Sequence, residues 1–155
     1  MTDKRSLEAK VREVHAGETS LAYRAMFALR ENRPVMATPE KFATWVDGKS
    51  RPEGYRLAAS FVPDREDAVA VAGFRFLHTL AWGKLLYVDD LVTLPEFRSG
   101  GHGDLLMDWL VAEATRLGCE QLHLDSGHHR HGAHRFYLNH GMRIDCHHFS
   151  RVLGS

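Results

Sequence analysis

The sequence predicts one domain of the α/β (α+β) class, with a central mixed, mostly antiparallel sheet, one parallel strand pair and flanking helices. Three apolar runs between residues 55 and 92 are rich in β-forming side chains and are separated by short turns, as in antiparallel strands. The last run leads through a glycine-rich loop into an amphipathic helix and another short strand. That order is typical of a right-handed crossover between parallel strands.

The first third of the chain predicts a strand and then a helix. Residues 7–15 alternate loosely between apolar and polar side chains, as a strand does. Residues 21–30 place apolar side chains near one helical face, and Thr19 or Ser20 offers a hydroxyl for the helix start. Asn32 and Pro34 are expected to end that helix.

A second helix is predicted to begin after Thr38. A capping hydroxyl, a proline at the first helical position and the acidic Glu40 in the first turn are together typical of a helix N-terminus. The helix is expected to run to about Val46. Residues 49–54 are polar and contain a proline and a glycine, so they predict a mobile loop.

The rest of the chain predicts strands alternating with helices. Strands are expected over residues 55–62, 68–79, 84–92, 120–125 and 142–152. Leucine and alanine side chains recur at helical spacing over residues 104–117, and Gly118 stands where a glycine ends such a helix. Residues 131–140 predict the last helix, which Gly141 stops.

Composition narrows the class of function. A chain of 155 residues suits a single domain, 1–155, and its 20 basic residues balance its 20 acidic ones. Bulk charge therefore predicts neither a nucleic-acid nor a membrane partner. No apolar run is long enough to span a bilayer and no signal peptide is apparent, so a cytoplasmic location is expected. Cys119 and Cys146 form no paired motif and are expected to be free thiols.

The glycine-rich loop between residues 90 and 103 predicts an anion site. The first N–H groups of a helix lack partners within it, and the helix dipole places partial positive charge there. Glycines at 100, 101 and 103 let a ligand approach the backbone. The nucleotide-hydrolase phosphate loop is excluded because no Lys-Ser or Lys-Thr follows the glycines. The dinucleotide fingerprint is incomplete because Leu106 occupies the position of its third glycine.

Two segments resemble motifs of the GCN5-related N-acetyltransferase (GNAT) superfamily. Arg98, Gly101 and Gly103 reproduce the spacing R-x-x-G-x-G of the family's pyrophosphate loop, and the preceding Leu94–Phe97 is also typical of it. Ala133–Met142 is similar to the family's A-x-x-F-Y-x-x-x-G-F segment, with methionine in place of the final aromatic residue. The predicted order of elements resembles the GNAT fold over nearly the whole chain.

The resemblance implies that acetyl-CoA binds at this loop. The strands on either side of the loop's helix would splay apart, and the pantetheine arm would pair with the backbone of Leu91, Val92 and Thr93. The pyrophosphate would rest on backbone N–H groups. The residues given this cofactor-binding role are Arg98, Ser99, Gly100, Gly101, His102, Gly103 and Asp104. The ring of His102 is expected to face outward. Arg130 occupies a position where many members carry a cofactor-contacting asparagine.

The implied reaction is N-acetylation of a primary amine, on a small molecule or a peptide, by direct attack in a ternary complex. Tyr137 would protonate the leaving thiolate, because a phenol with a pKa of about 10 is protonated at neutral pH. Asp89 and Asp90 are candidate bases for the attacking amine. Since successive strand residues point to opposite faces, only one of them is expected to face the substrate. A backbone N–H near Val92 could stabilise the oxyanion.

Three alternatives remain open at this stage. The chain could be a non-catalytic acyl-CoA-binding module on the same fold. It could instead bind metal through a histidine cluster, formed by His128, His129, His131, His134, His147 and His148. Structural metal sites usually include paired thiolates, so a surface cluster with no resident metal is the favoured interpretation. A nucleotide hydrolase is the least favoured. The family resemblance also suggests pairing as a homodimer.

Overall fold

The computed structural model describes residues 8–154. The chain divides into two compact units, residues 1–123 and residues 124–155. The predicted strand over residues 7–15 is found as β1, whereas its first residue, Leu7, lies outside the described residues.

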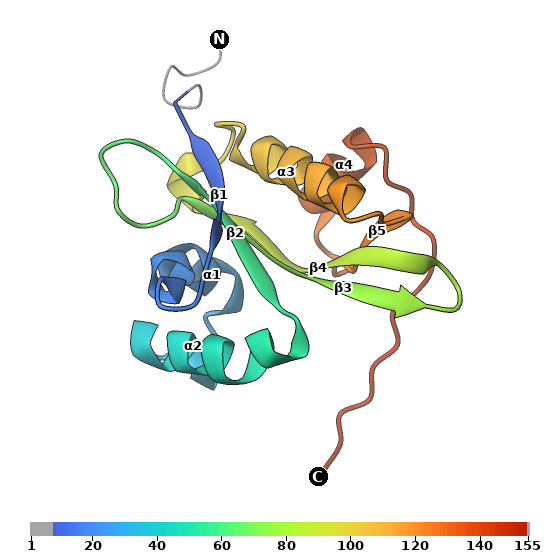
Figure 1. The fold of residues 1–155 in the computed structure, drawn as a ribbon, viewed down its shortest axis with the longest axis horizontal. Coiled ribbons are helices and arrows are strands. Elements are labelled where there is room, and N and C mark those ends of the chain that lie inside the picture. The colour runs from blue at the N-terminus through green and yellow to red at the C-terminus, as the bar shows by residue number, and fades with distance from the viewer. Residues whose placement is uncertain (1–7, 155) are drawn as a thin grey trace. The chain divides into compact units, whose positions relative to one another are not determined.

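The sheet has five strands in the order β1-β2-β3-β4-β5 (Figure 1). Their bounds are β1 (Lys10–Val14), β2 (Arg56–Phe61), β3 (Ala70–Thr79), β4 (Gly83–Thr93) and β5 (Gln121–Leu124). The first four strands pair antiparallel, and β5 runs parallel to β4. The mixed, mostly antiparallel sheet predicted from the sequence is therefore confirmed.

Helices cover both faces of this sheet within the first unit (Figure 1). They are α1 (Tyr23–Arg30), which follows a 3-10 turn η1 (Thr19–Ala22), and α2 (Pro39–Trp45), both on one face, and α3 (His102–Arg116) on the other. The core under α1 and α2 includes Met26, Phe42 and Leu57, each at most 3% exposed. Under α3, the Phe74 ring meets the Trp109 ring with centroids 5.7 Å apart. Burial on both faces holds the central strands between two helical layers.

The start of α2 is the cap that the sequence predicts. The Thr38 hydroxyl accepts a hydrogen bond from the Lys41 N–H at 3.1 Å. The predicted cap of the first helix is wrong. Thr19 is 1% exposed and its hydroxyl donates to the Asp47 carboxylate at 2.6 Å, while no side chain caps η1 or α1.

The predicted mobile loop over residues 49–54 is also wrong. The chain continues from α2 through a π-helical turn η3 (Val46–Ser50) and then a 3-10 turn η4 (Arg51–Glu53). Another 3-10 turn, η2 (Pro34–Met36), precedes α2. Arg51 donates to the Asp47 carboxylate and to the Val14 carbonyl, both at 2.8 Å. The contact with Asp47 spans one helical turn and the contact with Val14 ties that turn to β1, so both favour a helical path over the loop that Pro and Gly suggest. Gly54 ends this path with φ +94°.

The second unit contains the helix α4 (His131–Asn139) and no strand after it among the residues described. Gly141 follows α4 with φ +77°, which confirms the predicted stop. The predicted strand over residues 142–152 is wrong, since residues 142–154 have no regular secondary structure. A strand requires a neighbour for its backbone hydrogen bonds, and no described strand pairs with this segment.

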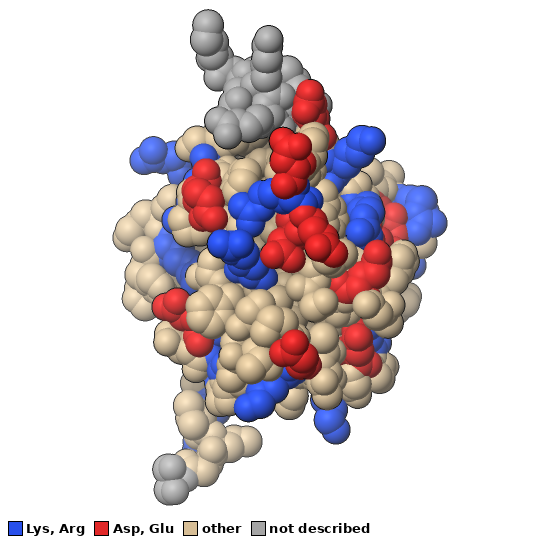
Figure 2. Space-filling model, turned by 90° about the vertical axis from the view of Figure 1, so that its left-hand side faces the viewer, with Lys and Arg blue, Asp and Glu red and all other residues tan. Residues whose placement is uncertain are grey.

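Charged side chains of both signs are interspersed on the face drawn in Figure 2. Neither sign forms a separate patch on the described part of that face, which agrees with the equal numbers of acidic and basic residues. None of the helices that the structure describes has both the length and the hydropathy that crossing a bilayer requires.

Candidate active site

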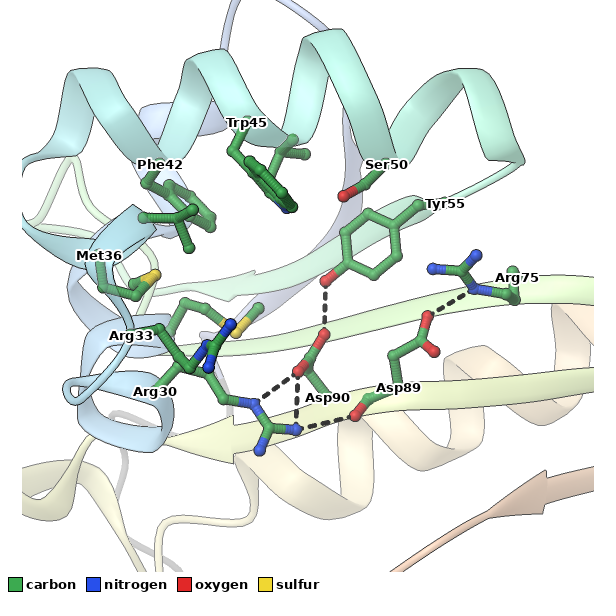
Figure 3. Close-up of a pocket in the computed structure, with 13 residues that line it drawn as sticks. Arg30, Arg33, Met36, Phe42, Trp45, Ser50, Tyr55, Arg75, Asp89 and Asp90 are labelled. Carbon is green, nitrogen blue, oxygen red and sulfur yellow. Dashed lines mark hydrogen bonds and ion pairs between the residues drawn. The ribbon is translucent and has the colours of Figure 1, made fainter. Parts of the chain in front are cut away.

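A cavity of about 260 Å³ lies between the α1–α2 layer and β4 (Figure 3). The side chains of Met36, Phe42 and Trp45 form an apolar wall on the helical side. The charged residues that line the cavity are Arg30, Arg33, Arg75, Asp89 and Asp90. A cavity with one apolar wall and a few convergent polar groups is typical of a small-molecule site.

A β-bulge brings two consecutive carboxylates to this cavity. In the β3–β4 ladder Gly73 pairs with Asp90 and Phe74 pairs with Val88, so Asp89 is an extra residue on β4. The expectation that only one of the two aspartates faces the site is therefore wrong, because regular alternation fails at the bulge. Both Asp89 and Asp90 line the cavity.

The Asp90 carboxylate is held on both oxygens. Arg30, at the end of α1, donates from Nε to Oδ1 at 2.9 Å, and the Tyr55 hydroxyl donates to Oδ2 at 2.7 Å (Figure 3). Burial raises the pKa of Tyr55 well above its usual value, with the Asp90 charge adding to the shift, so the phenol stays a donor. Arg30 also donates to the Asp89 carbonyl at 3.1 Å, so the Arg30 side chain fixes the bulge itself.

The Asp89 carboxylate is less constrained. Arg75 on β3 donates to its Oδ2 at 2.8 Å, and no described side chain donates to its other oxygen. Burial raises the pKa of the Asp89 carboxyl, and the Arg75 guanidinium opposes that shift. Of the two candidates, Asp89 is thus the carboxylate with an oxygen that accepts no described hydrogen bond, and its own pKa is raised.

The glycine loop leads into α3 as the sequence predicts. Gly101 stands just before the helix with φ +82°, and a Cβ built there would meet nothing within 4 Å. The first helical bond runs from the Leu105 N–H to the Gly101 carbonyl at 3.1 Å. The N–H groups of His102 and Gly103 precede it and have no acceptor within the helix. Open space at Gly101 beside N–H groups at the positive end of the helix dipole suits a phosphate.

Part of the predicted cradle is occupied by the loop itself. The N–H groups of Arg98 and Gly100 donate to carbonyls three residues earlier, each at 3.3 Å. Ser99 adopts φ +68°, an unusual conformation for a residue with a side chain, which helps to reverse the chain here. The Asp104 side chain is exposed in the first turn of α3.

The far end of β4 extends beyond its parallel neighbour. Leu91, Val92 and Thr93 pair with β3 on one side. On the other side the Glu120 N–H donates to the Lys84 carbonyl at 2.8 Å, which sets the register with β5 near the start of β4. Since β5 has only four residues, it ends before β4 reaches Leu91. No described strand pairs with that edge of β4 at Leu91 to Thr93, so its backbone groups could pair with an extended ligand.

The expectation for the His102 ring is wrong. His102 is 3% exposed, and its Nδ1 lies 2.9 Å from the Ser60 hydroxyl of β2. The Phe97 ring packs edge-on against it, with centroids 5.9 Å apart. Burial lowers the pKa of the imidazole. His102 therefore anchors the first turn of α3 to the sheet.

Tyr137 and Arg130 both belong to the second unit. Tyr137 lies within α4, is half-buried, and its hydroxyl makes no hydrogen bond to any described residue. Burial raises the pKa of this phenol, opposed by Arg130, so the hydroxyl carries its proton at neutral pH. Arg130 is exposed at the start of α4.

Four histidines of the predicted cluster contact other residues of the second unit. His134 Nε2 lies 2.9 Å from the Gly127 carbonyl, and His148 pairs with Asp125 at 3.2 Å. His128 and His129 contact each other ring to ring, with centroids 5.5 Å apart. Across residues 8–154 no three histidine, cysteine or acidic side chains converge as a metal site would need.

Sequence reasoning missed the cavity residues that hold the two aspartates. Arg30, Tyr55 and Arg75 come from α1, from the residue before β2, and from β3, and no motif links them in the sequence. Arg33, in the turn after α1, was missed as well. A tyrosine after Gly54 gives no signal by itself, because its role depends on the bulge opposite it.

Comparison with known proteins places the chain beside acetyltransferases. A sequence model of the Acetyltransferase (GNAT) family matches residues 22–142, which is most of the chain. The aminoalkylphosphonate N-acetyltransferase of Salmonella typhimurium is 34% identical over 77 residues, or 50% of this chain and 49% of that enzyme. The chain thus spans about half or less of the length of the curated relatives it matches.

Solved structures share the fold over nearly the whole chain. An acetyltransferase of Trypanosoma brucei is 20% identical with a TM-score of 0.76, covering 94% of this chain and 99% of that one. An aminoglycoside N-acetyltransferase solved in complex with CoA is 14% identical with a TM-score of 0.77, covering 94% and 95%. At such identities the likeness is one of fold alone.

Proposed function

The chain belongs to the GNAT acetyltransferase family, and we propose that it moves an acetyl group from acetyl-CoA to a primary amine of a small molecule, by direct attack in a ternary complex. The observation that carries this proposal is the bulge that turns Asp89 and Asp90 into one cavity beside the end of β4. A volume of about 260 Å³ suits a small amine better than a folded protein partner. The relative that acts on aminoalkylphosphonates supports a small acceptor.

Acetyl-CoA fits the donor groups at the start of α3. The backbone N–H groups of His102 and Gly103, with the open space at Gly101, would hold its pyrophosphate. The unpaired edge of β4 at Leu91 to Thr93 would take its pantetheine arm as an added strand. When bound, it supplies the thioester that the amine attacks. The family's use of acetyl-CoA and the CoA-bound neighbour support this assignment.

Asp89 is the general base in this proposal. Its free oxygen and raised pKa suit it to take a proton from the acceptor ammonium, directly or through one water. Asp90 is less suited to act as the base, because both of its carboxylate oxygens already accept hydrogen bonds, from Arg30 and Tyr55. Asp90 is a positioning residue that links α1 and the start of β2 to the bulge.

Tyr137 completes the proton transfers. Because its pKa is raised, this half-buried phenol carries its proton at neutral pH, so the hydroxyl can hydrogen-bond to the sulfur and donate the proton as the C–S bond breaks. The role rests on the family motif that surrounds Tyr137 and on a hydroxyl without a partner among the described residues. Arg130 would contact the cofactor in place of the family's asparagine.

Thermal unfolding with acetyl-CoA tests the cofactor site. Ligand at a hundred times its dissociation constant stabilises by about 2.7 kcal/mol, or roughly 5–10 °C for a chain of this size. Gly101→Glu should abolish the shift. Gly118→Glu is the matched control, because Gly118 has φ +74°, equal open space and a place at the opposite end of α3. If acetyl-CoA raises Tm in both variants or in neither, the result contradicts a cofactor site at Gly101.

Steady-state kinetics on a panel of amines test the base. Asp89→Asn should lower kcat/KM roughly 100-fold or more, whereas the exposed Asp108→Asn should not. A base must be deprotonated, so wild-type kcat/KM should fall as pH drops through the raised pKa of Asp89. The Asp89→Asn variant should lack this acidic decline in its pH profile. Ligand binding without turnover of any amine would favour the acyl-CoA-binding module instead. Stabilisation by Zn²⁺ and not by acetyl-CoA would favour the metal-binding alternative.

A further inference from the structure

The cavity has more positive than negative charge. Three guanidinium groups, those of Arg30, Arg33 and Arg75, line it together with two carboxylates. Arg30 pairs with Asp90 at 2.9 Å, and Arg75 pairs with Asp89 at 2.8 Å. Arg33 has no ion pair or side-chain hydrogen bond within residues 8–154, so one positive charge is left over.

That surplus affects the acceptor directly. A primary amine approaches mainly as an ammonium ion, since alkylamines have pKa values near 10. The two carboxylates that would attract it are already neutralised by their own arginines, and the third guanidinium repels it. An acceptor that carries only an amine is therefore poorly matched to this cavity. An acceptor that also carries an acidic group would satisfy the third guanidinium.

Arg33 and Asp89 lie at different places in the cavity, so they could bind the acidic group and the amine of one acceptor. Arg33 lies in the turn after α1, beside Arg30 and the apolar wall, whereas Asp89 lies beyond Asp90 on β4 (Figure 3). A guanidinium binds carboxylate, phosphate or phosphonate oxygens through two parallel N–H bonds. The apolar side chains of Met36 and Trp45 lie along the same cavity and suit a short carbon chain.

We propose that Arg33 binds an acidic group of the acceptor, so that the substrate is a small zwitterion with a primary amine at Asp89 and a phosphonate, phosphate or carboxylate at Arg33. This inference rests on the proposed function. It goes beyond that function by excluding simple alkylamines and neutral amino alcohols as good acceptors.

Matched amines test the preference. We would compare kcat/KM for 2-aminoethylphosphonate and β-alanine with ethanolamine and propylamine. The wild type should favour the acidic amines by roughly 10- to 100-fold, the range expected for a charge-assisted hydrogen bond. In Arg33→Gln this ratio should collapse toward one, chiefly through KM. Arg33→Glu should instead prefer 1,3-diaminopropane, which carries a second amine, over the acidic amines. Arg24→Gln, on the exposed side of α1, should keep the wild-type ratio.

A binding measurement separates this proposal from the activity. Propylphosphonate has no amine and cannot be acetylated, so its binding does not depend on turnover. By calorimetry it should bind the wild type and Arg24→Gln, and at least tenfold more weakly Arg33→Gln. Equal binding to all three, or equal wild-type kcat/KM for matched amines, overturns the acidic acceptor. Propylphosphonate binding at Arg33 without turnover of any amine would instead contradict the proposed function alone.

Discussion

Asp90 shows how much one side chain depends on residues distant in the sequence. Its carboxylate joins Arg30 of α1 to Tyr55, and the Tyr55 ring fits only because residue 73 is a glycine. A Cβ at Gly73 would overlap the Tyr55 hydroxyl and ring. The absence of a side chain on β3 therefore creates the space in which the phenol reaches the carboxylate.

Gly73→Ala should displace the Tyr55 ring and break its bond to Asp90. The ring is 7% exposed, so its displacement strains a packed region, and we expect a loss of about 1–3 kcal/mol in unfolding free energy. Acceptor KM should rise as well, because the bulge loses a support. Urea unfolding and kinetics measure the two effects. Gly48→Ala, where a Cβ meets nothing within 4 Å, serves as the control. Unchanged stability in Gly73→Ala would contradict the packing described.

At the scale of elements, Arg56 ties three of them together. It donates to the Glu13 carboxylate of β1 at 2.7 and 2.9 Å, and to the Glu113 carboxylate of α3 at 2.9 Å. Arg116 also binds Glu113, at 2.6 Å. Hydrogen bonds from Arg116 and Arg56 lower the pKa of Glu113 to about 2.

Arg56→Met should lower the unfolding free energy by about 1.5–3 kcal/mol, or Tm by roughly 3–12 °C. The side chains of Arg56, Glu13 and Glu113 are all at most 25% exposed, so solvent screens them only in part. A carboxylate with a lowered pKa stabilises above its ordinary value near 4.5, and that contribution disappears as pH falls toward 2. The difference between wild type and variant should thus shrink between pH 5 and pH 2. A difference independent of pH would argue for lost packing alone.

Elements that depend on local chemistry were predictable. The Thr38 cap, the glycine after α3 and the glycine after α4 each act within four residues of their own helix, so their effect is visible in the sequence. The same holds for Gly101 in the glycine loop, whose positive φ follows from its residue type, but not for Ser99, whose φ of +68° does not. The order of strands and helices up to α4 followed from these signals together with the apolar runs, whereas the strand predicted after α4 is wrong.

Features that depend on a partner segment were not predictable. The bulge at Asp89 exists only in the register with β3, and nothing within β4 announces it. The helical path of residues 46–53 depends on Arg51 reaching Val14. The apolar and polar residues of 142–152 resemble a strand, yet a strand is defined by its neighbour. His102 was misplaced because Ser60, its partner, is 42 residues away.

At the scale of the whole molecule, the exposed segment after α4 suggests that the chain pairs with a second copy. Ile144, Phe149, Val152 and Leu153 are each 76–90% exposed. Apolar side chains gathered at this density commonly mark an interface. None of the described strands pairs with this segment, so its backbone groups could add to the sheet edge of another chain.

We therefore expect a homodimer, and the double variant Phe149→Ser, Val152→Ser should shift it toward monomer. Light scattering after size-exclusion chromatography over a dilution series measures the change. Ser150→Ala, within the same segment, should leave the mass unchanged. A wild type that is monomeric at all concentrations contradicts the expectation.

The bulge in β4 also constrains how this gene can vary. Because Asp89 is one residue more than the ladder needs, loss of its codon would restore regular pairing between β3 and β4 and remove one of the two carboxylates that line the cavity. Replacing Asp89 with another amino acid leaves that geometry intact. Substitution of Asp89 therefore changes the chemistry of the site and keeps its backbone, whereas an in-frame deletion changes both.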